Sequence, residues 1–257
     1  MYPNELFFGL TLYEVFIVLG IFAAMLLYRR YSTRAGLSAK LHNLVILSAV
    51  CAVVGGYLSG VLFQAVYNWL DGGTFSLDGT GGSTFLGGFL GGLGLLCAVY
   101  FGVGGILFPK TGDREHIVKF PAVMDGLTVS VALGHGFGRI GCLMAGCCHG
   151  LPSAHGIYFQ NLGCRAIPTQ LYEALFLFAL SAALWFLVKR FPSAGLGIYC
   201  VSYGAWRFFI EFFRGDERGK TVVPFLTPSQ LIAVLLIFSG IVLLIARAAK
   251  RRRTHEE

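Results

Sequence analysis

The chain has 257 residues, of which 56% are hydrophobic and 13% are charged, and its mean hydropathy is +0.71. This composition excludes a soluble globular domain and is typical of a protein that crosses a membrane several times. The formal net charge of +7 could suit a nucleic-acid partner, but the basic residues lie in short loops between apolar segments. That distribution follows membrane topology, so we expect the bilayer and its anionic lipid as partners, and no nucleic acid.

Seven apolar segments predict an all-α polytopic membrane protein with about seven transmembrane helices, since each helix needs about 20 apolar residues to cross the bilayer. No separate extramembrane domain is evident, and we expect residues 1–257 to form a single transmembrane helical domain. The N-terminus lacks a basic segment followed by a cleavage site, so we expect the first apolar segment to be a retained span rather than a signal peptide. The predicted spans are residues 6–28, 44–70, 84–108, 121–147, 169–189, 195–213 and 228–248.

The basic residues favour an N-terminus outside and a cytoplasmic C-terminus. With this orientation fourteen of the 20 Lys and Arg residues are cytoplasmic: Arg29, Arg30, Arg34, Lys40, Lys110, Arg114, Lys119, Lys189, Arg190, Arg247, Lys250, Arg251, Arg252 and Arg253. The other six lie within or just beyond the outer ends of spans four to six, on the side that the positive-inside rule disfavours. They are Arg139, Arg165, Arg207, Arg214, Arg218 and Lys220, and their position indicates an anion site.

Residues 135–150 interrupt the fourth apolar segment with an arginine, three cysteines, two histidines and five glycines. A guanidinium group at membrane depth costs several kcal/mol unless it faces a cavity or an anionic partner, so Arg139 is a candidate site residue. A structural ion pair with Glu173 or Glu211 is the alternative.

The sixth span carries a polar stripe. Tyr203, Arg207, Glu211 and Arg214 are separated by four, four and three residues. Because this spacing places them on one helical face, we expect the stripe to point into the helix bundle or a water-filled cavity.

Glycine is dense between residues 79 and 92, where the third span begins. This density suits either a close helix crossing or a loop that folds back into the membrane. Two segments, Pro168–Glu173 and Pro228–Gln230, predict helix starts because proline lies near the first turn and a hydroxyl residue follows.

The cysteines do not indicate a disulfide framework, and Cys51, Cys97 and Cys200 lie inside apolar segments where we expect them to pack in the core. Four thiols remain to be explained, those of Cys142, Cys147, Cys148 and Cys164. A catalytic thiolate beside Arg139, packing in a tight turn, and a disulfide to Cys164 all stay open. A metal site that includes His149 would have soft ligands, but Cys-x4-Cys-Cys-His is not a common zinc pattern, and we expect no metal ion.

Three motifs follow one another along the chain: Gly138–Gly141, Pro168–Ala174 and Tyr203–Arg214. In order and in spacing they resemble the motifs of the prolipoprotein diacylglyceryl transferase family. The resemblance implies that Arg139 and Arg207 are essential and that Tyr203 and Glu211 are functional positions. The chain also departs from the family, which has a histidine in place of Leu86, an asparagine in place of Cys142 and a glutamate in place of Cys147.

The implied reaction moves a diacylglyceryl group from phosphatidylglycerol to the lipobox cysteine of an exported prolipoprotein and releases glycerol 1-phosphate, without a cofactor. Arg139 and Arg207 are expected to hold the phosphate, because guanidinium donors match phosphate oxygens. Glu211 and Tyr203 are expected to orient groups or to deprotonate the thiol, and His135 and His149 are further candidate bases. The alternative for His135 is an ordinary hydrogen bond. Substrate contacts are expected from Gly87, Gly88, Gly138, Gly141, Glu173 and Arg214.

The resemblance and the charge distribution together imply a multi-pass protein of the bacterial plasma (inner) membrane whose site faces the outer leaflet. One alternative function is a diverged phospholipid-dependent transferase whose acceptor is another thiol, an alcohol or a glycan. A second is a non-catalytic lipid or anion carrier. The sequence leaves open the acceptor, the general base, the state of the thiols and the number of protomers.

Overall fold

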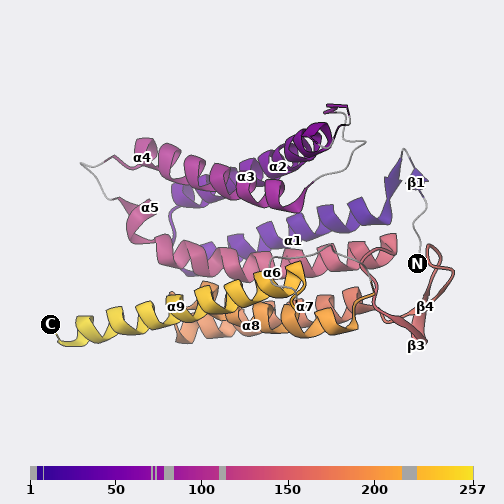
Figure 1. Cartoon of the computed structure of the whole chain (residues 1–257). Coiled ribbons are helices and arrows are strands. Elements are labelled where there is room, and N and C mark those ends of the chain that lie inside the picture. Colours follow the sequence, from indigo (N-terminus) through magenta and orange to yellow (C-terminus); the bar gives the residue numbers. More distant parts are fainter. Residues whose placement is uncertain are drawn as a thin grey trace. The chain divides into compact units, whose positions relative to one another are not determined.

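The computed structural model describes residues 5–7, 9–70, 72, 74–77, 84–109, 114–215 and 225–256, and it is predominantly helical (Figure 1). Within this described part, six helices are long and apolar enough to cross a membrane. This finding confirms the predicted all-α polytopic membrane class. The six segments are Leu12–Arg34, Ala39–Leu70, Gly87–Leu107, Phe120–Ala145, Thr169–Arg190 and Pro228–Arg253.

The chain divides into two compact units, the first comprising Met1–Tyr31 with Pro121–Glu257 and the second Ser32–Phe120. The first unit holds nearly all of α1 (Leu12–Arg34) and of α6 (Phe120–Ala145). It also holds β1 (Glu5–Phe7), β2 (Leu10–Thr11), β3 (Pro152–Phe159), β4 (Cys164–Ala166), α7 (Thr169–Arg190), α8 (Gly195–Ile210), the 3₁₀ turn η2 (Glu211–Phe213) and α9 (Pro228–Glu256). The second unit holds α2 (Ala39–Leu70), α3 (Phe85–Cys97), the π-helix η1 (Ala98–Val103), α4 (Gly104–Leu107) and α5 (Glu115–Val118).

The first helix begins at Leu12, six residues later than predicted, because β1 pairs with β2 in an antiparallel ladder just before it. Thr11 and Glu14 form the start of the helix. The Thr11 backbone N–H donates to Glu14 Oε2 over 2.8 Å, and the Thr11 hydroxyl donates to the same oxygen. A carboxylate three residues into the helix thus satisfies a backbone donor at its beginning, as in a capping box.

Small residues bring the helices of the first unit close together. A Cβ atom added at Gly20 of α1 would lie 3.0 Å from the Gly134 carbonyl oxygen of α6, and one at Gly240 of α9 would lie 2.8 Å from the Gly197 carbonyl oxygen of α8. Such close backbone approach is the usual means of helix packing in a bilayer. Between α6, α7 and α8 lies a buried apolar cluster of Val129, Ala132, Leu177, Leu180, Leu184, Val188 and Tyr203.

Helix α8 has 16 residues and is therefore about 24 Å long, shorter than the six segments named above and not one of them. The turn η2 continues it to Phe213, and the two together cover the range 195–213 predicted for the sixth span. Ordinary helical hydrogen bonding thus ends at Ile210, just before the polar residue Glu211.

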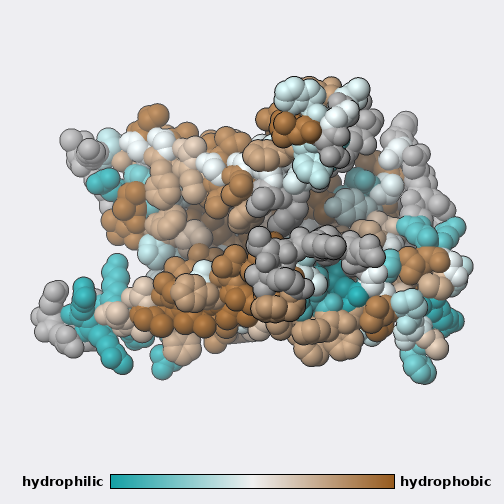
Figure 2. All heavy atoms as spheres, viewed as in Figure 1, coloured by the Kyte–Doolittle hydropathy of each residue, from teal (hydrophilic) through white to brown (hydrophobic). Residues whose placement is uncertain are grey.

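Many large hydrophobic side chains on the long helices are exposed, as expected for a surface that faces lipid. On α9 the hydrophobic surface extends along the helix and becomes hydrophilic at its C-terminal end (Figure 2), where Lys250, Arg251, Arg252 and Arg253 are exposed. Phe209 of α8 and Phe212 of η2 are 55% and 61% exposed, whereas Arg207 of α8 is 6% exposed. The predicted polar stripe therefore faces inward, and its phenylalanines face outward.

A β-hairpin follows α6 that the sequence analysis did not predict. Strand β3 pairs with β4 in an antiparallel ladder, and a register shift lies between Pro152 and Ile157. Phe159 and Ala166 are fully buried and pack with Leu143 of α6. The hairpin therefore has its own apolar contact with the end of α6.

In the second unit, α2 packs against α3 through glycines. A Cβ atom at Gly92 would lie 2.9 Å from the Ala52 carbonyl oxygen, and one at Gly88 would lie 3.2 Å from the Gly56 carbonyl oxygen. Ser59 also donates a hydrogen bond to the Gly87 carbonyl oxygen over 2.9 Å. A close helix crossing therefore accounts for the glycines of α3, whereas residues 79–83 of the glycine-rich segment lie outside the described residues.

Gly92→Val is expected to destabilise the protein by about 1–3 kcal/mol, because the added side chain meets backbone that cannot rotate away. Gly94→Val is the matched control in the same helix, since a Cβ atom at Gly94 meets no described atom within 4 Å. The thermal unfolding midpoint in detergent should fall in the first variant and stay near wild type in the second. Equal midpoints in the two variants would contradict the crossing.

Candidate active site

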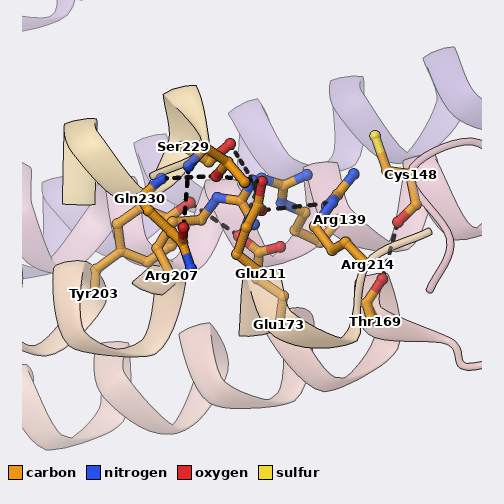
Figure 3. A network of polar contacts seen from close by, with 11 residues as sticks. Arg139, Cys148, Thr169, Glu173, Tyr203, Arg207, Glu211, Arg214, Ser229 and Gln230 are labelled. Carbon is orange, nitrogen blue, oxygen red and sulfur yellow. Dashed lines mark hydrogen bonds and ion pairs between the residues drawn. The ribbon is translucent and has the colours of Figure 1, made fainter. Parts of the chain in front are cut away.

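Polar side chains from α6, α7, α8, η2 and the start of α9 converge inside the first unit (Figure 3). The core of this polar cluster has three arginines and two glutamates, and it includes a tyrosine and a serine that bond to them. Its members are Arg139, Glu173, Tyr203, Arg207, Glu211, Arg214 and Ser229. All of these residues lie in the first unit of the fold.

Arg139 of α6 pairs with Glu173 of α7, with 3.0 Å between Nη2 and Oε1. The hydroxyl of Tyr203 on α8 donates to the same carboxylate oxygen over 2.9 Å. Glu173 is fully buried, and the Arg139 side chain is 16% exposed. Of the two partners proposed from the sequence for Arg139, the structure thus selects Glu173.

Arg207 of α8 pairs with Glu211 one turn later, with 2.8 Å between Nη2 and Oε2. The same nitrogen donates to Ser229 Oγ at the start of α9 over 2.8 Å. Glu211 also accepts a hydrogen bond from the Thr227 hydroxyl over 3.0 Å, and Arg214 Nε lies 3.8 Å from its Oε2. Arg207, Glu211 and Arg214 of the predicted polar stripe are therefore joined by contacts among themselves, whereas Tyr203 bonds to Glu173.

These ion pairs leave donors unused. Arg139 Nε and Arg207 Nη1 are buried nitrogens that have no hydrogen-bond partner within the described part of the chain. The cluster also contains three guanidinium groups and only two carboxylates, so it carries one excess positive charge. Because a buried charge and buried N–H groups are costly without partners, this site is suited to an anion with several acceptor oxygens.

The histidines lie at the edge of this arrangement. His135 Nδ1 is 3.3 Å from the Tyr199 hydroxyl, and its ring meets the Tyr203 ring edge-on with 5.0 Å between centroids. The ordinary hydrogen bond expected as the alternative for His135 is therefore present. His149 Nδ1 lies 3.1 Å from the Gly150 carbonyl oxygen, and its ring packs near Phe159.

The predicted glycines have two different surroundings. Gly141 of α6 faces α1, where an added Cβ atom would lie 3.2 Å from the Tyr13 carbonyl oxygen. A Cβ atom at Gly138 would make an ordinary contact with Ile17 at 3.7 Å. Gly87 and Gly88 belong to the second unit and lie in its helix crossing. A role for these glycines in lipid approach stays a prediction. Arg218 and Lys220, named with the outer basic residues, lie outside the described residues.

Three cysteines gather where α6 ends. The sulfur atoms of Cys142, Cys147 and Cys148 all lie within 4.8 Å of one another, and neither Cys164 nor His149 belongs to this group. All seven cysteines are outside disulfides, so the bond to Cys164 considered above is not formed. Contacts with the Cys142 and Cys147 thiols, together with the Arg214 guanidinium, hold the pKa of the Cys148 thiol below its usual range.

Of the cysteines expected in the core, Cys200 is buried and Cys51 is half-buried. Cys97 is exposed on α3, so its predicted core position is wrong. An apolar segment gives no sign of which residues face lipid when the helix surface is apolar all round.

The sequence analysis missed the part of the network contributed by α9 and by the start of α7. Ser229 bonds Arg207, and Gln230 Oε1 accepts the Thr227 backbone N–H over 3.0 Å. Thr169 donates to the Cys148 carbonyl oxygen over 2.9 Å, and Gln170 donates to that of Cys147 over 2.5 Å. The signal was the polar triplet that opens each helix: both triplets were interpreted as helix starts, and the first also lies in the Pro168–Ala174 motif, but no contact was assigned to either.

Comparison with known proteins agrees with this architecture. A family model described as prolipoprotein diacylglyceryl transferase matches residues 5–246. A phosphatidylglycerol–prolipoprotein diacylglyceryl transferase 2 of Clostridium perfringens is 31% identical, over 96% of this chain and 95% of the relative. Two proteins named phosphatidylglycerol–prolipoprotein diacylglyceryl transferase are each 32% identical. The match to the one from Clostridium tetani covers 91% of this chain and 92% of that relative. The match to the one from Methylococcus capsulatus covers 93% of this chain and 91% of that relative. The chain therefore belongs to the prolipoprotein diacylglyceryl transferase family.

Proposed function

We propose that this enzyme transfers the diacylglyceryl group of phosphatidylglycerol to the lipobox cysteine thiol of a prolipoprotein and releases glycerol 1-phosphate. The names of the relatives supply the donor and the acceptor. The observation that carries the proposal to this chain is the buried cluster of three guanidinium groups and two carboxylates, with unused N–H donors on Arg139 and Arg207.

In this reaction the acceptor sulfur forms a bond to the glycerol carbon, the carbon–oxygen bond to the phosphate breaks, and the thiol proton passes to the released glycerol 1-phosphate or to solvent. Negative charge grows on the departing phosphate. Guanidinium groups already in place stabilise this charge strongly in a site with little water. Arg139 and Arg207 are the proposed phosphate ligands, since each has one nitrogen held by a carboxylate and another nitrogen unused.

The carboxylates and Tyr203 act as positioning residues in this proposal. Glu173 holds Arg139 and accepts from Tyr203, while Glu211 holds Arg207 and lies near Arg214. The excess positive charge of the cluster also favours the thiolate form of an acceptor cysteine that enters the site. The same arginines thus support both the nucleophile and the leaving group.

For the membrane setting, we propose the bacterial inner membrane, an N-terminus outside, and a site that opens to the outer leaflet. The positive-inside rule supports this orientation, since the exposed basic residues Lys250–Arg253 at the end of α9 then lie in the cytoplasm. An exported prolipoprotein would then meet the site on the side where its cysteine emerges.

Purified protein incubated with labelled phosphatidylglycerol and a lipobox peptide is expected to form a diacylglyceryl thioether and an equal amount of glycerol 1-phosphate. A peptide with serine in place of the lipobox cysteine is the control and should give no lipidated product. Release of glycerol 1-phosphate without a lipidated peptide would refute the lipobox cysteine as the acceptor. Unchanged phosphatidylglycerol would refute the transferase activity.

A further inference from the structure

The three thiols at the end of α6 belong to a turn of defined geometry. Cys142 lies in the last turn of α6, and the chain reverses at Gly146, whose φ is +75° and whose N–H donates to the Leu143 carbonyl oxygen over 3.2 Å. Glycine suits this position because the left-handed conformation carries no Cβ penalty there. The reversal brings Cys147 back to the helix end, where its thiol donates to the Cys142 carbonyl oxygen over 3.6 Å.

Cys148 has a φ of 62°, which is unusual for a residue other than glycine. In an extended chain two consecutive side chains point to opposite sides. The left-handed backbone at Cys148 instead lets two adjacent cysteines direct their sulfur atoms to the same place. This conformation lets both adjacent cysteines reach one ion, although their spacing is not a common zinc pattern.

From this convergence we propose that Cys142, Cys147 and Cys148 form a trithiolate site for one monovalent copper ion. Thiolates are soft ligands that select Cu⁺ and Zn²⁺ over hard cations. Metal–sulfur bonds of about 2.3 Å in a trigonal plane place the sulfurs about 4.0 Å apart. The three sulfurs already lie within 4.8 Å of one another, so small side-chain rotations close the site.

The number of ligands favours copper over zinc. Structural zinc sites have four protein ligands and catalytic ones have three and a bound water, whereas Cu⁺ is satisfied by three soft thiolates alone. The described residues offer only the three sulfur atoms, since His149 is outside the group. Mg²⁺ and Ca²⁺ prefer oxygen ligands and are not expected to bind here.

The surroundings of the turn suit the bound state. Two side chains of α7 form hydrogen bonds to the backbone of the turn: Thr169 donates to the Cys148 carbonyl oxygen, and Gln170 donates to the Cys147 carbonyl oxygen. A backbone bridge joins Gly150 to Arg214, and the Arg214 guanidinium lies beside the Cys148 thiol. Binding releases a proton from each neutral thiol, and the negative charge of three thiolates around one Cu⁺ is balanced in part by this arginine. Cys147 is exposed, which gives an ion a path into the site.

The test is a titration of the full-length protein in detergent with Cu⁺ under anaerobic, reducing conditions, against a chromogenic Cu⁺ chelator. We expect one tightly bound Cu⁺ per chain, and three sulfur neighbours in the copper X-ray absorption spectrum. Cys147→Ser should weaken binding by more than about 100-fold, since even mutations around metal ligands cost 10–100-fold. Cys164→Ser is the matched control and should bind as the wild type does.

A second measurement uses the unaltered chain, so it does not depend on how a variant folds. Bound Cu⁺ should slow alkylation of Cys147, followed by mass spectrometry, and leave alkylation of Cys164 unchanged. Absence of a stoichiometric ion, unchanged binding in Cys147→Ser, or equal protection of Cys164 would overturn the site. Stoichiometric binding of Zn²⁺ with none of Cu⁺ would overturn the copper assignment. Since the readout is metal binding, failure here leaves the proposed transferase activity standing.

Discussion

Arg207→Ala is expected to lower kcat/KM for diacylglyceryl transfer by about 10²–10³-fold, the cost of losing one charge-stabilising donor group in a site with little water. Arg207 Nη1 is a buried donor with no partner in the described chain, while Nη2 is held by Glu211 and Ser229. The rate of lipidated peptide formation measures the loss. The fold should persist, because Glu211 keeps its contacts with Thr227 and Arg214 in this variant.

Arg207→Lys should recover little of this rate, since an ammonium group cannot contact Glu211, Ser229 and a phosphate with one rigid fork. Arg190→Ala is the matched control: Arg190 is exposed at the end of α7, so the same substitution there should leave the rate unchanged. Full activity in Arg207→Ala, with a normal unfolding midpoint, would remove Arg207 from the mechanism.

The paired substitution Arg139→Gln/Glu173→Gln is expected to separate the structural role of this ion pair from its role in catalysis. Arg139→Gln alone leaves a fully buried carboxylate without its charge partner, and breaking a buried pair in this way costs about 3–5 kcal/mol. The double variant has two neutral amides that can bond to each other and to Tyr203, so much of the lost stability should return. The rate of transfer should stay at least about 10²-fold below wild type, because the phosphate ligand is still missing.

Unfolding midpoints and transfer rates of the single and double variants, measured in the same detergent, give both quantities. Glu173→Gln alone completes the double-mutant cycle and measures the loss of stability when Arg139 has no carboxylate partner. Recovery of activity together with stability in the double variant would show that Arg139 serves only to hold Glu173 in place.

Features set by local spacing could be predicted from the sequence. The apolar segments predicted the long helices, since hydrocarbon thickness fixes the length that a span requires. The spacing of four residues predicted that Arg207 and Glu211 share a face, and the structure joins them in an ion pair. The first helix begins later than its apolar segment because the pairing of β1 with β2 takes up residues before Leu12.

Features set by packing between distant segments could not be predicted. The sequence left Arg139 with two possible acids, and only the packing of α6 against α7 selects Glu173. Ser229 enters the site because α8 packs on α9, which no spacing within either helix reveals. The grouping of three thiols depends on the backbone conformation at Cys148, and a short hairpin with both apolar and polar residues gave no clear strand pattern.

The central claim is that Arg139 and Arg207 both bind the phosphate of one phosphatidylglycerol headgroup. Its most direct test is magnetic-resonance measurement of ³¹P–¹⁵N dipolar coupling between bound phosphatidylglycerol and protein labelled at its arginine guanidinium nitrogens, with assignments from Arg139→Lys and Arg207→Lys. We predict strong coupling from the phosphate to both guanidinium groups, with one contribution lost in each variant. Coupling that is absent, or that is unchanged in both variants, would contradict the claim.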